Sequence, residues 1–198
     1  MTALVSPSVR SEKPSQAAPI IRRAWIEDID AVRDQVWGLA QASSTAPRWS
    51  DVAYREYLAL EAARSDIQAK VLFIACVQTE PIGSLVISSE NARAARERVV
   101  GFAALSAVPG AGECALDNMV VAESWRKQGI GTRLLSAGLL WCRAHAGSSV
   151  WLEVRASNRG AIALYERAGF SIAGRRPGYY SEPVEPALQM RKLLGPVA

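Results

Sequence analysis

The feature that most constrains this chain is an apolar strand that runs directly into a glycine turn and a long amphipathic helix. The strand-like run Ala115–Val121 precedes Arg126-Lys127-Gln128-Gly129-Ile130-Gly131, and apolar residues then recur at helical spacing over 129–146. Unpaired N–H groups and the dipole at a helix start attract an anion, and glycines let a phosphate approach the backbone. On spacing alone, a tight turn that packs the helix on the strand is the favoured interpretation, and a phosphate site is the alternative.

The letters of this turn exclude two common nucleotide motifs. A Rossmann fingerprint requires a third glycine three residues after Gly131, where this chain has Leu134. A Walker loop requires Gly-Lys followed by Ser or Thr after a four-residue gap, and the turn has no such sequence. The turn on its own therefore leaves the identity of the ligand open.

Hydrophobic periodicity along the rest of the chain predicts a mixed α/β fold. Residues 1–19 are rich in Ser, Pro and Ala and predict a flexible tail before one domain over 20–195. Segment 78–98 is ambiguous, because Pro81 and Gly83 indicate a turn while its charged end also suits a helix. Strands are expected over 20–24, 71–77, 99–108, 115–121, 150–155, 170–173 and 188–194, and helices over 29–39, 51–60, 129–146 and 159–168. This order predicts a mostly antiparallel sheet covered by helices.

Composition excludes several classes of protein. No apolar run approaches the roughly 20 residues that span a bilayer, and the N-terminus has no secretory pattern, so a cytoplasmic protein without a membrane partner is expected. The three cysteines lie far apart and His145 is the only histidine, which leaves little material for a metal site or a Ser-His-Asp triad. The net charge of +4 suits an anionic ligand or simply a solvated surface, and no stable nucleic-acid binding is expected.

The turn and the segments after it resemble a known family. Residues 126–131 are similar to the Arg/Gln-x-x-Gly-x-Gly/Ala signature of GNAT acetyltransferases, in which this loop cradles the pyrophosphate of acetyl-CoA. Residues 151–158 (WLEVRASN) and 161–166 (AIALYE) are similar, nearly letter for letter, to the bacterial ribosomal-protein alanine N-acetyltransferases. Three shorter matches are Pro47-Arg48-Trp49-Ser50, Arg175-Arg176 and Tyr179-Tyr180. The resemblance covers 20–194 and is strongest over 117–180.

The resemblance implies the GNAT fold, acetyl-CoA as co-substrate and no metal. It places the pantetheine arm and the oxyanion on the backbone at the end of the strand, and the diphosphate on the turn. The cofactor contacts implied in this way are Met119, Val120, Val121, Arg126, Lys127, Gln128, Gly129, Ile130, Gly131, Thr132 and Asn158. Asn158 is also expected to cap the helix that follows it, and the two roles are compatible.

The resemblance further places a general base at Glu153 and a proton donor at Tyr165. Apolar neighbours on the strand are expected to raise the pKa of Glu153 toward the working range, whereas the alternative is an exposed i, i+2 ion pair with Arg155. The alternative for Tyr165 is core packing, because Leu164 and Tyr165 share an apolar helix face. No cysteine is placed to act as a nucleophile, so direct transfer within a ternary complex is expected.

The acceptor that the resemblance implies is the N-terminal alanine of a small-subunit ribosomal protein, with Arg175, Arg176, Tyr179 and Tyr180 in the acceptor cleft. The chain departs from the family at Pro177-Gly178 and in loop 181–186, which holds two prolines and two glutamates. Other acceptors therefore stay open: another protein N-terminus, a lysine, a small-molecule amine or aminoacyl-tRNA. A non-catalytic CoA-binding regulator is the alternative from another class, and both a monomer and a homodimer suit the sequence.

Overall fold

The computed structural model describes residues 18–25, 29–47, 49–59, 69–78, 97–108 and 110–195. The elements are, in chain order, β1 (Ile20–Arg23), α1 (Ile29–Ala42), α2 (Asp51–Ala59), β2 (Ala69–Gln78), β3 (Glu97–Val108), β4 (Glu113–Val121), the short 3-10 helix η2 (Glu123–Trp125), α4 (Ile130–Ala144), β5 (Ser149–Arg155), α5 (Arg159–Arg167), β6 (Ser171–Ser181) and β7 (Val184–Leu193). Most of the expected tail, Arg48 and nearly all of the ambiguous segment 78–98 lie outside the described residues.

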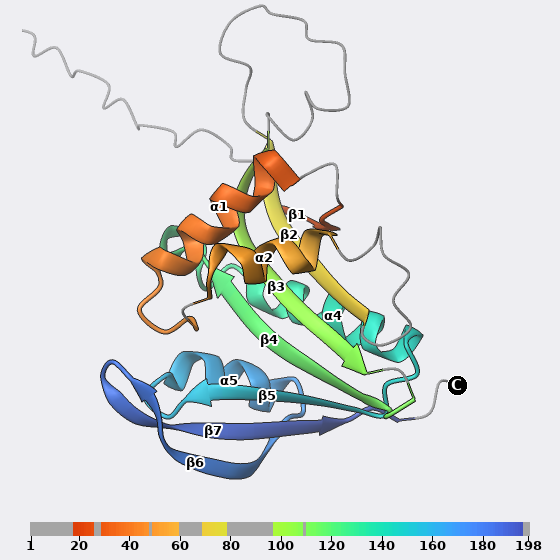
Figure 1. The fold of residues 1–198 in the computed structure, drawn as a ribbon, viewed down its shortest axis with the longest axis vertical. Coiled ribbons are helices and arrows are strands. Elements are labelled where there is room, and N and C mark those ends of the chain that lie inside the picture. Colours follow the sequence, from red (N-terminus) through yellow and green to blue (C-terminus); the bar gives the residue numbers. More distant parts are fainter. Residues whose placement is uncertain are drawn as a thin grey trace, which may run out of the picture.

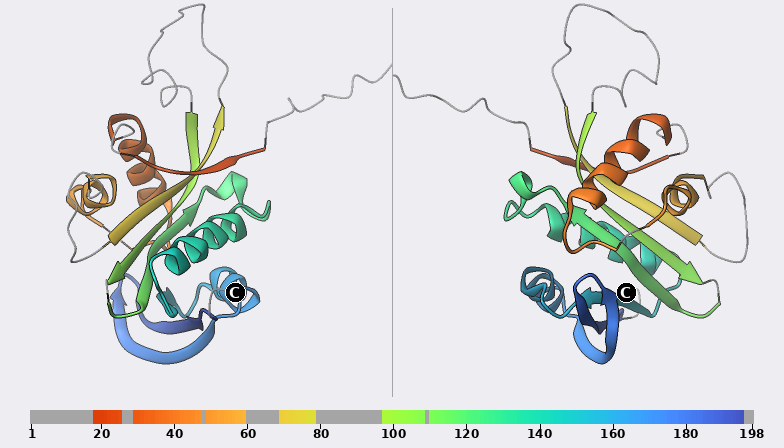
Figure 2. Two further views of the ribbon diagram at one scale, coloured as in Figure 1. Left: turned by 90° about the vertical axis from the view of Figure 1, so that its right-hand side faces the viewer. Right: turned by 60° about the vertical axis from the view of Figure 1, so that its left-hand side comes forward.

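The strands form one seven-stranded sheet in the order β1-β2-β3-β4-β5-β7-β6. Neighbouring strands are antiparallel throughout, except for β4 and β5, which run parallel. Helix α4 covers one face of the sheet, and α1 with α2 covers the other (Figure 2). The predicted mixed α/β class with a mostly antiparallel sheet is confirmed.

Alternate side chains of β2 belong to two hydrophobic cores, one on each face of the sheet. Leu72 and Ile74 belong to a buried cluster with Val36 of α1 and Tyr54 of α2. Val71, on the opposite face, belongs to a second cluster that contains apolar residues of α4. Because a strand sends successive side chains to opposite faces, a continuous apolar run is what a strand covered on both faces requires.

The parallel pair β4 and β5 stays together over only part of its length. Pairing runs from Glu113 opposite Ser149 to Leu116 opposite Leu152, and the strands then diverge toward the Val121 end (Figure 1). On its other edge β4 carries a bulge at the same position. Ala104 and Leu105 of β3 pair with Asn118 and Leu116, so Asp117 is the extra residue.

Side chains cap the starts of two helices, and Asn158 does so as predicted. The Ser50 hydroxyl accepts a hydrogen bond of 3.3 Å from Ala53 N at the start of α2. Asn158 Oδ1 accepts one of 3.2 Å from Ala161 N at the start of α5. Each bond satisfies a first-turn N–H group that has no partner inside the helix, which stabilises a helix by about 1 kcal/mol.

The two closing strands are much longer than the sequence suggested. A Pro-rich loop was expected over 174–187, but β6 and β7 continue through it and leave only a tight turn that includes a cis peptide bond between Glu182 and Pro183. A register shift between Arg176 and Tyr180 accommodates Pro177 and Gly178. Proline is tolerated there because β6 is the edge strand and has no partner on its outer side.

Other expectations from composition concern thiols, metals and membranes. All three cysteines are free and buried. Within the described ranges, no three His, Cys, Asp or Glu side chains gather closely enough to hold a metal ion. None of the helices in the described part of the chain combines the length and apolar character needed to cross a bilayer.

Gly101 of β3 lies close against the neighbouring strand β4. A Cβ at Gly101 would lie 2.9 Å from the Val120 carbonyl oxygen, a backbone atom that has little freedom to move. We predict that Gly101→Ala lowers the free energy of unfolding by about 1–3 kcal/mol in urea denaturation. The control is Gly38→Ala. A Cβ at Gly38 in α1 meets nothing within 4 Å, and the substitution removes a glycine that weakens the helix. An unchanged stability of Gly101→Ala would contradict this packing.

Candidate active site

A cleft of about 560 Å³ occupies the space between the diverging strands. Its walls come from the bulged half of β4, the end of β5, the start of α4 and one face of α5. The site residues expected from the sequence that line it are Met119, Val120, Val121, Arg126, Lys127, Gly129, Ile130, Gly131, Thr132, Glu153, Asn158, Tyr165 and Tyr180. The structure therefore brings most of these residues into one cavity.

The start of α4 forms one end of the cleft. Gly129 is the N-cap, with a left-handed φ of 77°, and no side chain caps the helix. A Cβ at Gly129 would meet no atom within 4 Å, so the space beside it is open. Lys127 also has a left-handed φ, of 61°, which is strained for a residue with a side chain. Uncapped N–H groups beside an open space and two cationic side chains suit a diphosphate.

Two side chains of this loop hydrogen-bond to nearby backbone carbonyl groups. Gln128 Nε2 donates a 3.3 Å hydrogen bond to Ser124 O, and Gln128 does not line the cleft. Arg126 Nε donates a 3.2 Å bond to Val121 O, which ties the loop to the end of β4 while the residue still lines the cavity. The sequence-based assignment of Gln128 as a cofactor contact therefore finds no support in the shape of the cleft.

Glu153 is the carboxylate of β5 that faces the cleft. Glu153 Oε1 accepts hydrogen bonds from Arg176 at 2.7 Å and from Gln189 at 3.3 Å. Burial by itself raises the pKa of Glu153, but hydrogen bonds from Tyr179 and Arg176 outweigh it and hold the pKa below its ordinary value. The expectation of a raised pKa is therefore wrong, and Glu153 is a carboxylate at neutral pH.

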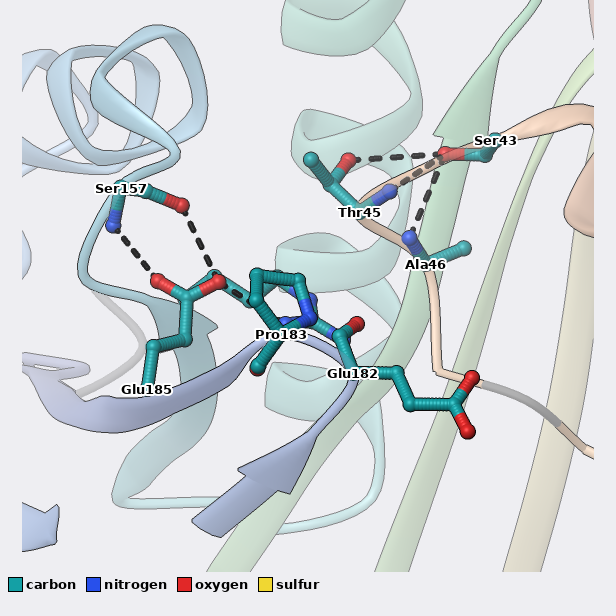
Figure 3. A network of polar contacts seen from close by, with 8 residues as sticks. Ser43, Thr45, Ala46, Ser157, Glu182, Pro183 and Glu185 are labelled. Atoms are coloured by element: carbon teal, nitrogen blue, oxygen red, sulfur yellow. Dashed lines mark hydrogen bonds and ion pairs between the residues drawn. The ribbon is translucent and has the colours of Figure 1, made fainter. Parts of the chain in front are cut away.

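The expected alternative, an exposed pair between Glu153 and Arg155, is also wrong. Arg155 is buried and donates a 2.8 Å bond to Glu185 Oε1 of β7, and its guanidinium lies 4.0 Å from the Tyr180 ring centroid. Glu185 also accepts hydrogen bonds from the backbone N and the hydroxyl of Ser157 (Figure 3). This network fastens the end of β5 to the β6–β7 turn and fixes one wall of the cleft.

Tyr165 of α5 lies deep in the cleft wall. It is 7% exposed, and its ring packs against Phe170 with centroids 5.9 Å apart. Burial, with a smaller contribution from Tyr180, raises the pKa of Tyr165 above its ordinary value, so the phenol keeps its proton at neutral pH. Core packing and a position in the cleft wall coexist, because Tyr165 packs against Phe170 and also lines the cavity.

A second cavity of about 460 Å³ adjoins the cleft. Glu153, Tyr180, Asp117, Leu116 and Pro47 line both cavities, so the two meet at these residues. The expected acceptor residues Tyr179 and Tyr180 line the second cavity, and Arg175 lines neither. The arginine that reaches the site is its neighbour Arg176, through its ion pair with Glu153.

Sequence reasoning missed the role of Asp117 and its partner on α2. Tyr57 donates a 2.8 Å hydrogen bond from its hydroxyl to Asp117 Oδ2. Burial raises the pKa of Asp117, and hydrogen bonds from Ser106 and Tyr57 oppose this shift only in part. The sequence signal was Asp117 itself, a charged residue inside the apolar run Ala115–Val121. Charged residues are seldom buried without a partner, so a carboxylate in such a run indicates a specific contact or role.

Comparison with known proteins agrees with this geometry. Residues 35–170 match the acetyltransferase (GNAT) family. This chain belongs to the GNAT acetyltransferase family. The [ribosomal protein bS18]-alanine N-acetyltransferase of Escherichia coli K12 is 43% identical over 68 residues, which are 34% of this chain and 46% of the relative. An N-alpha-acetyltransferase of Saccharolobus solfataricus is 36% identical over 77 residues, 38% of this chain and 46% of the relative.

These matches span less than half the length of the curated relatives. The structural match is more extensive. The crystal structure of the Escherichia coli ribosomal-protein-S18-alanine N-acetyltransferase superposes with a TM-score of 0.63 at 24% identity, covering 91% of this chain and 96% of the other. The GNAT fold therefore extends over nearly the whole chain, well beyond the segment of clear sequence identity.

Substitution of the N-cap of α4 tests whether this helix start binds the diphosphate of coenzyme A. We predict that Gly129→Ala weakens coenzyme A binding about tenfold, equal to about 1.4 kcal/mol, because a methyl group would enter the space beside the uncapped N–H groups. Gly110→Ala is the matched control, since Gly110 has nearly the same φ of 78° and equally open surroundings outside the cleft.

Both variants should lose similar stability, about 1–2 kcal/mol, from left-handed strain. Calorimetric titration with coenzyme A separates strain from ligand contact. Equal affinities of Gly129→Ala and Gly110→Ala would mean that the start of α4 does not hold the diphosphate.

Proposed function

We propose that this protein transfers the acetyl group of acetyl-CoA to a primary amine by direct attack within a ternary complex. One observation supports this above all: a single cleft is lined both by the uncapped start of α4 and by Glu153 and Tyr165. A cofactor held by its diphosphate at the start of α4 extends its thioester toward Glu153 and Tyr165. Membership of the GNAT family agrees with this use of the cleft.

The middle of the cleft suits the pantetheine arm. Within the described residues, β4 has no β5 partner beyond Leu116. Apart from Val121 O, which accepts from Arg126, its backbone groups on that edge from Asp117 onward are therefore available to an amide chain. The same N–H groups are suitable donors for the oxyanion that develops on the thioester carbonyl. We expect Asn158, which also lines this cleft, to contact the cofactor while it caps α5.

Two side chains supply the proton chemistry in this proposal. The nitrogen of the acceptor forms a bond to the acetyl carbon while the carbon–sulfur bond breaks. Glu153, ionised at neutral pH, accepts a proton from the acceptor nitrogen, and Tyr165, which keeps its proton, donates one to the departing thiolate. Because an α-amino group has a pKa of about 7.7–8.0, part of the acceptor is already neutral at physiological pH.

The acceptor that we propose is the N-terminal alanine of a small-subunit ribosomal protein. Support comes from the 43% identity over 68 residues to the bacterial enzyme named for that reaction. The similar protein from Saccharolobus solfataricus is named only an N-alpha-acetyltransferase, which favours another protein N-terminus as the second candidate. In both cases the second cavity, lined by Tyr179 and Tyr180, receives the first residues of the acceptor.

We predict that the purified chain acetylates a peptide that begins with alanine, and that Glu153→Gln lowers kcat/KM by about a hundredfold or more. The matched control is Glu113→Gln at the exposed start of β4, which should retain full activity. Coenzyme A affinity should be the same in all three proteins, because Glu153 lies at the acceptor end of the cleft. Activity is measured by mass spectrometry of the peptide.

The acceptor panel adds an acetyl-blocked peptide with an internal lysine and the polyamine spermidine. Preference for the alanine peptide supports the proposed acceptor, and preference for either other amine assigns a different one. Full activity of Glu153→Gln on every amine would contradict the proposed base, whichever acceptor is preferred.

A further inference from the structure

The bulge in β4 places Asp117 at the junction of the two cavities. Asp117 and Glu153 both line the cleft and the second cavity, on opposite sides of the point where β4 and β5 diverge. A thioester in the cleft and an amine in the second cavity would meet at this junction. The junction therefore has two carboxylates, whereas the proposed proton transfer uses only Glu153.

Helix α2 holds this side of the junction through two parallel contacts. Tyr54 and Tyr57, one turn apart, bond to the consecutive residues Asn118 and Asp117 at 3.2 Å and 2.8 Å. Consecutive strand residues ordinarily point to opposite faces, and the bulge lets both reach α2. Trp49 lies 5.2 Å from each tyrosine ring and is stacked on Tyr57.

The two carboxylates differ in their partners. Glu153 is ion-paired with Arg176 at 2.7 Å. Asp117 forms no ion pair within the part of the chain that the structure describes, and its oxygens face the hydroxyls of Tyr57 and Ser106. The nearest cation that acts on it, Lys70, is itself bound to Glu56 at 2.8 Å. Asp117 is half-buried, and a carboxylate partly removed from water without a paired cation is costly, so a cationic ligand would stabilise it.

The second cavity has the composition of a cation site. Its described lining contains the acidic residues Asp117 and Glu153 and no Lys, Arg or His. The rings of Trp49, Trp151 and Tyr179 also line it, with Arg191 over one face of Trp151 and Arg176 over one face of Tyr179. Aromatic faces attract cations, and an ammonium group has three donors for a carboxylate that still has lone pairs to offer.

We propose that Asp117 binds the acceptor amine in its ammonium form and positions it beside Glu153, so that α2 is part of the acceptor site. This inference rests on the proposed function and assigns a substrate-binding residue to it. Asp117 binds and positions the amine, and Glu153 removes its proton. Tyr57 orients the Asp117 carboxylate, and Trp49 supports Tyr57 from outside.

The test measures recognition of the positive charge without turnover. The chain, saturated with coenzyme A, is titrated by calorimetry with two peptides. One begins with alanine, and in the other a propionyl group replaces that alanine, so that only the amine is missing. The wild-type protein should bind the amino peptide at least tenfold more tightly. Asp117→Asn should bind both peptides equally, whereas Glu153→Gln should keep most of the preference.

Tyr54→Phe is the matched control, because it removes the parallel hydroxyl contact on α2 and leaves Asp117 untouched; its preference for the amino peptide should persist. Thermal unfolding verifies that each variant is folded, and Asp117→Ser serves as a second variant if Asp117→Asn is not. A tenfold preference that survives loss of the Asp117 carboxylate overturns the inference, as does a wild-type protein that binds both peptides alike. Failure of the wild type to bind coenzyme A would instead overturn the proposed function and this inference with it.

Discussion

The site depends on the early end of pairing between β4 and β5. A parallel pair that continued to Val121 would saturate the backbone of both strands and leave no space between them. Pairing stops at Leu116 opposite Leu152, and the bulge at Asp117 turns β4 away at that point. The resulting cleft lies between the diverging halves of the two strands, and a hydrophobic core packs on each face of the sheet beside it.

The walls of the cleft are held by contacts that take no part in the proposed proton transfer. Arg155 and Glu185 fasten β5 to β7, and Tyr57 with Asp117 fastens α2 to β4. Both contacts place charged groups at the site in defined positions before any ligand arrives. Preorganised charge is the main means by which an enzyme stabilises a transition state, because no reorganisation is then needed during the reaction.

Much of this fold could be predicted from the sequence because its signals are local. The period of α4, the caps Ser50 and Asn158, and the glycine turn at Gly129 are set by neighbours in the chain. Contacts set by strand order could not be predicted. Arg176 reaches Glu153 only because β7 lies between β5 and β6 and brings them into register, and this long-range pairing reversed the expected pKa shift of Glu153. The two closing strands were expected, but their extension through the prolines was missed for a similar reason, since prolines indicate a loop until the edge position of β6 is known.

The central claim is that the start of α4 holds the diphosphate of an acyl-CoA and so directs the thioester to Glu153 and Tyr165. Paired calorimetric titrations of the wild-type chain with coenzyme A and with 4′-phosphopantetheine, which lacks the diphosphate and the nucleotide, test it most directly. The account predicts one coenzyme A site per chain and affinity at least a hundredfold weaker, about 2.7 kcal/mol, for the truncated ligand. Equal affinity for the two ligands, or no measurable affinity for coenzyme A, would contradict it.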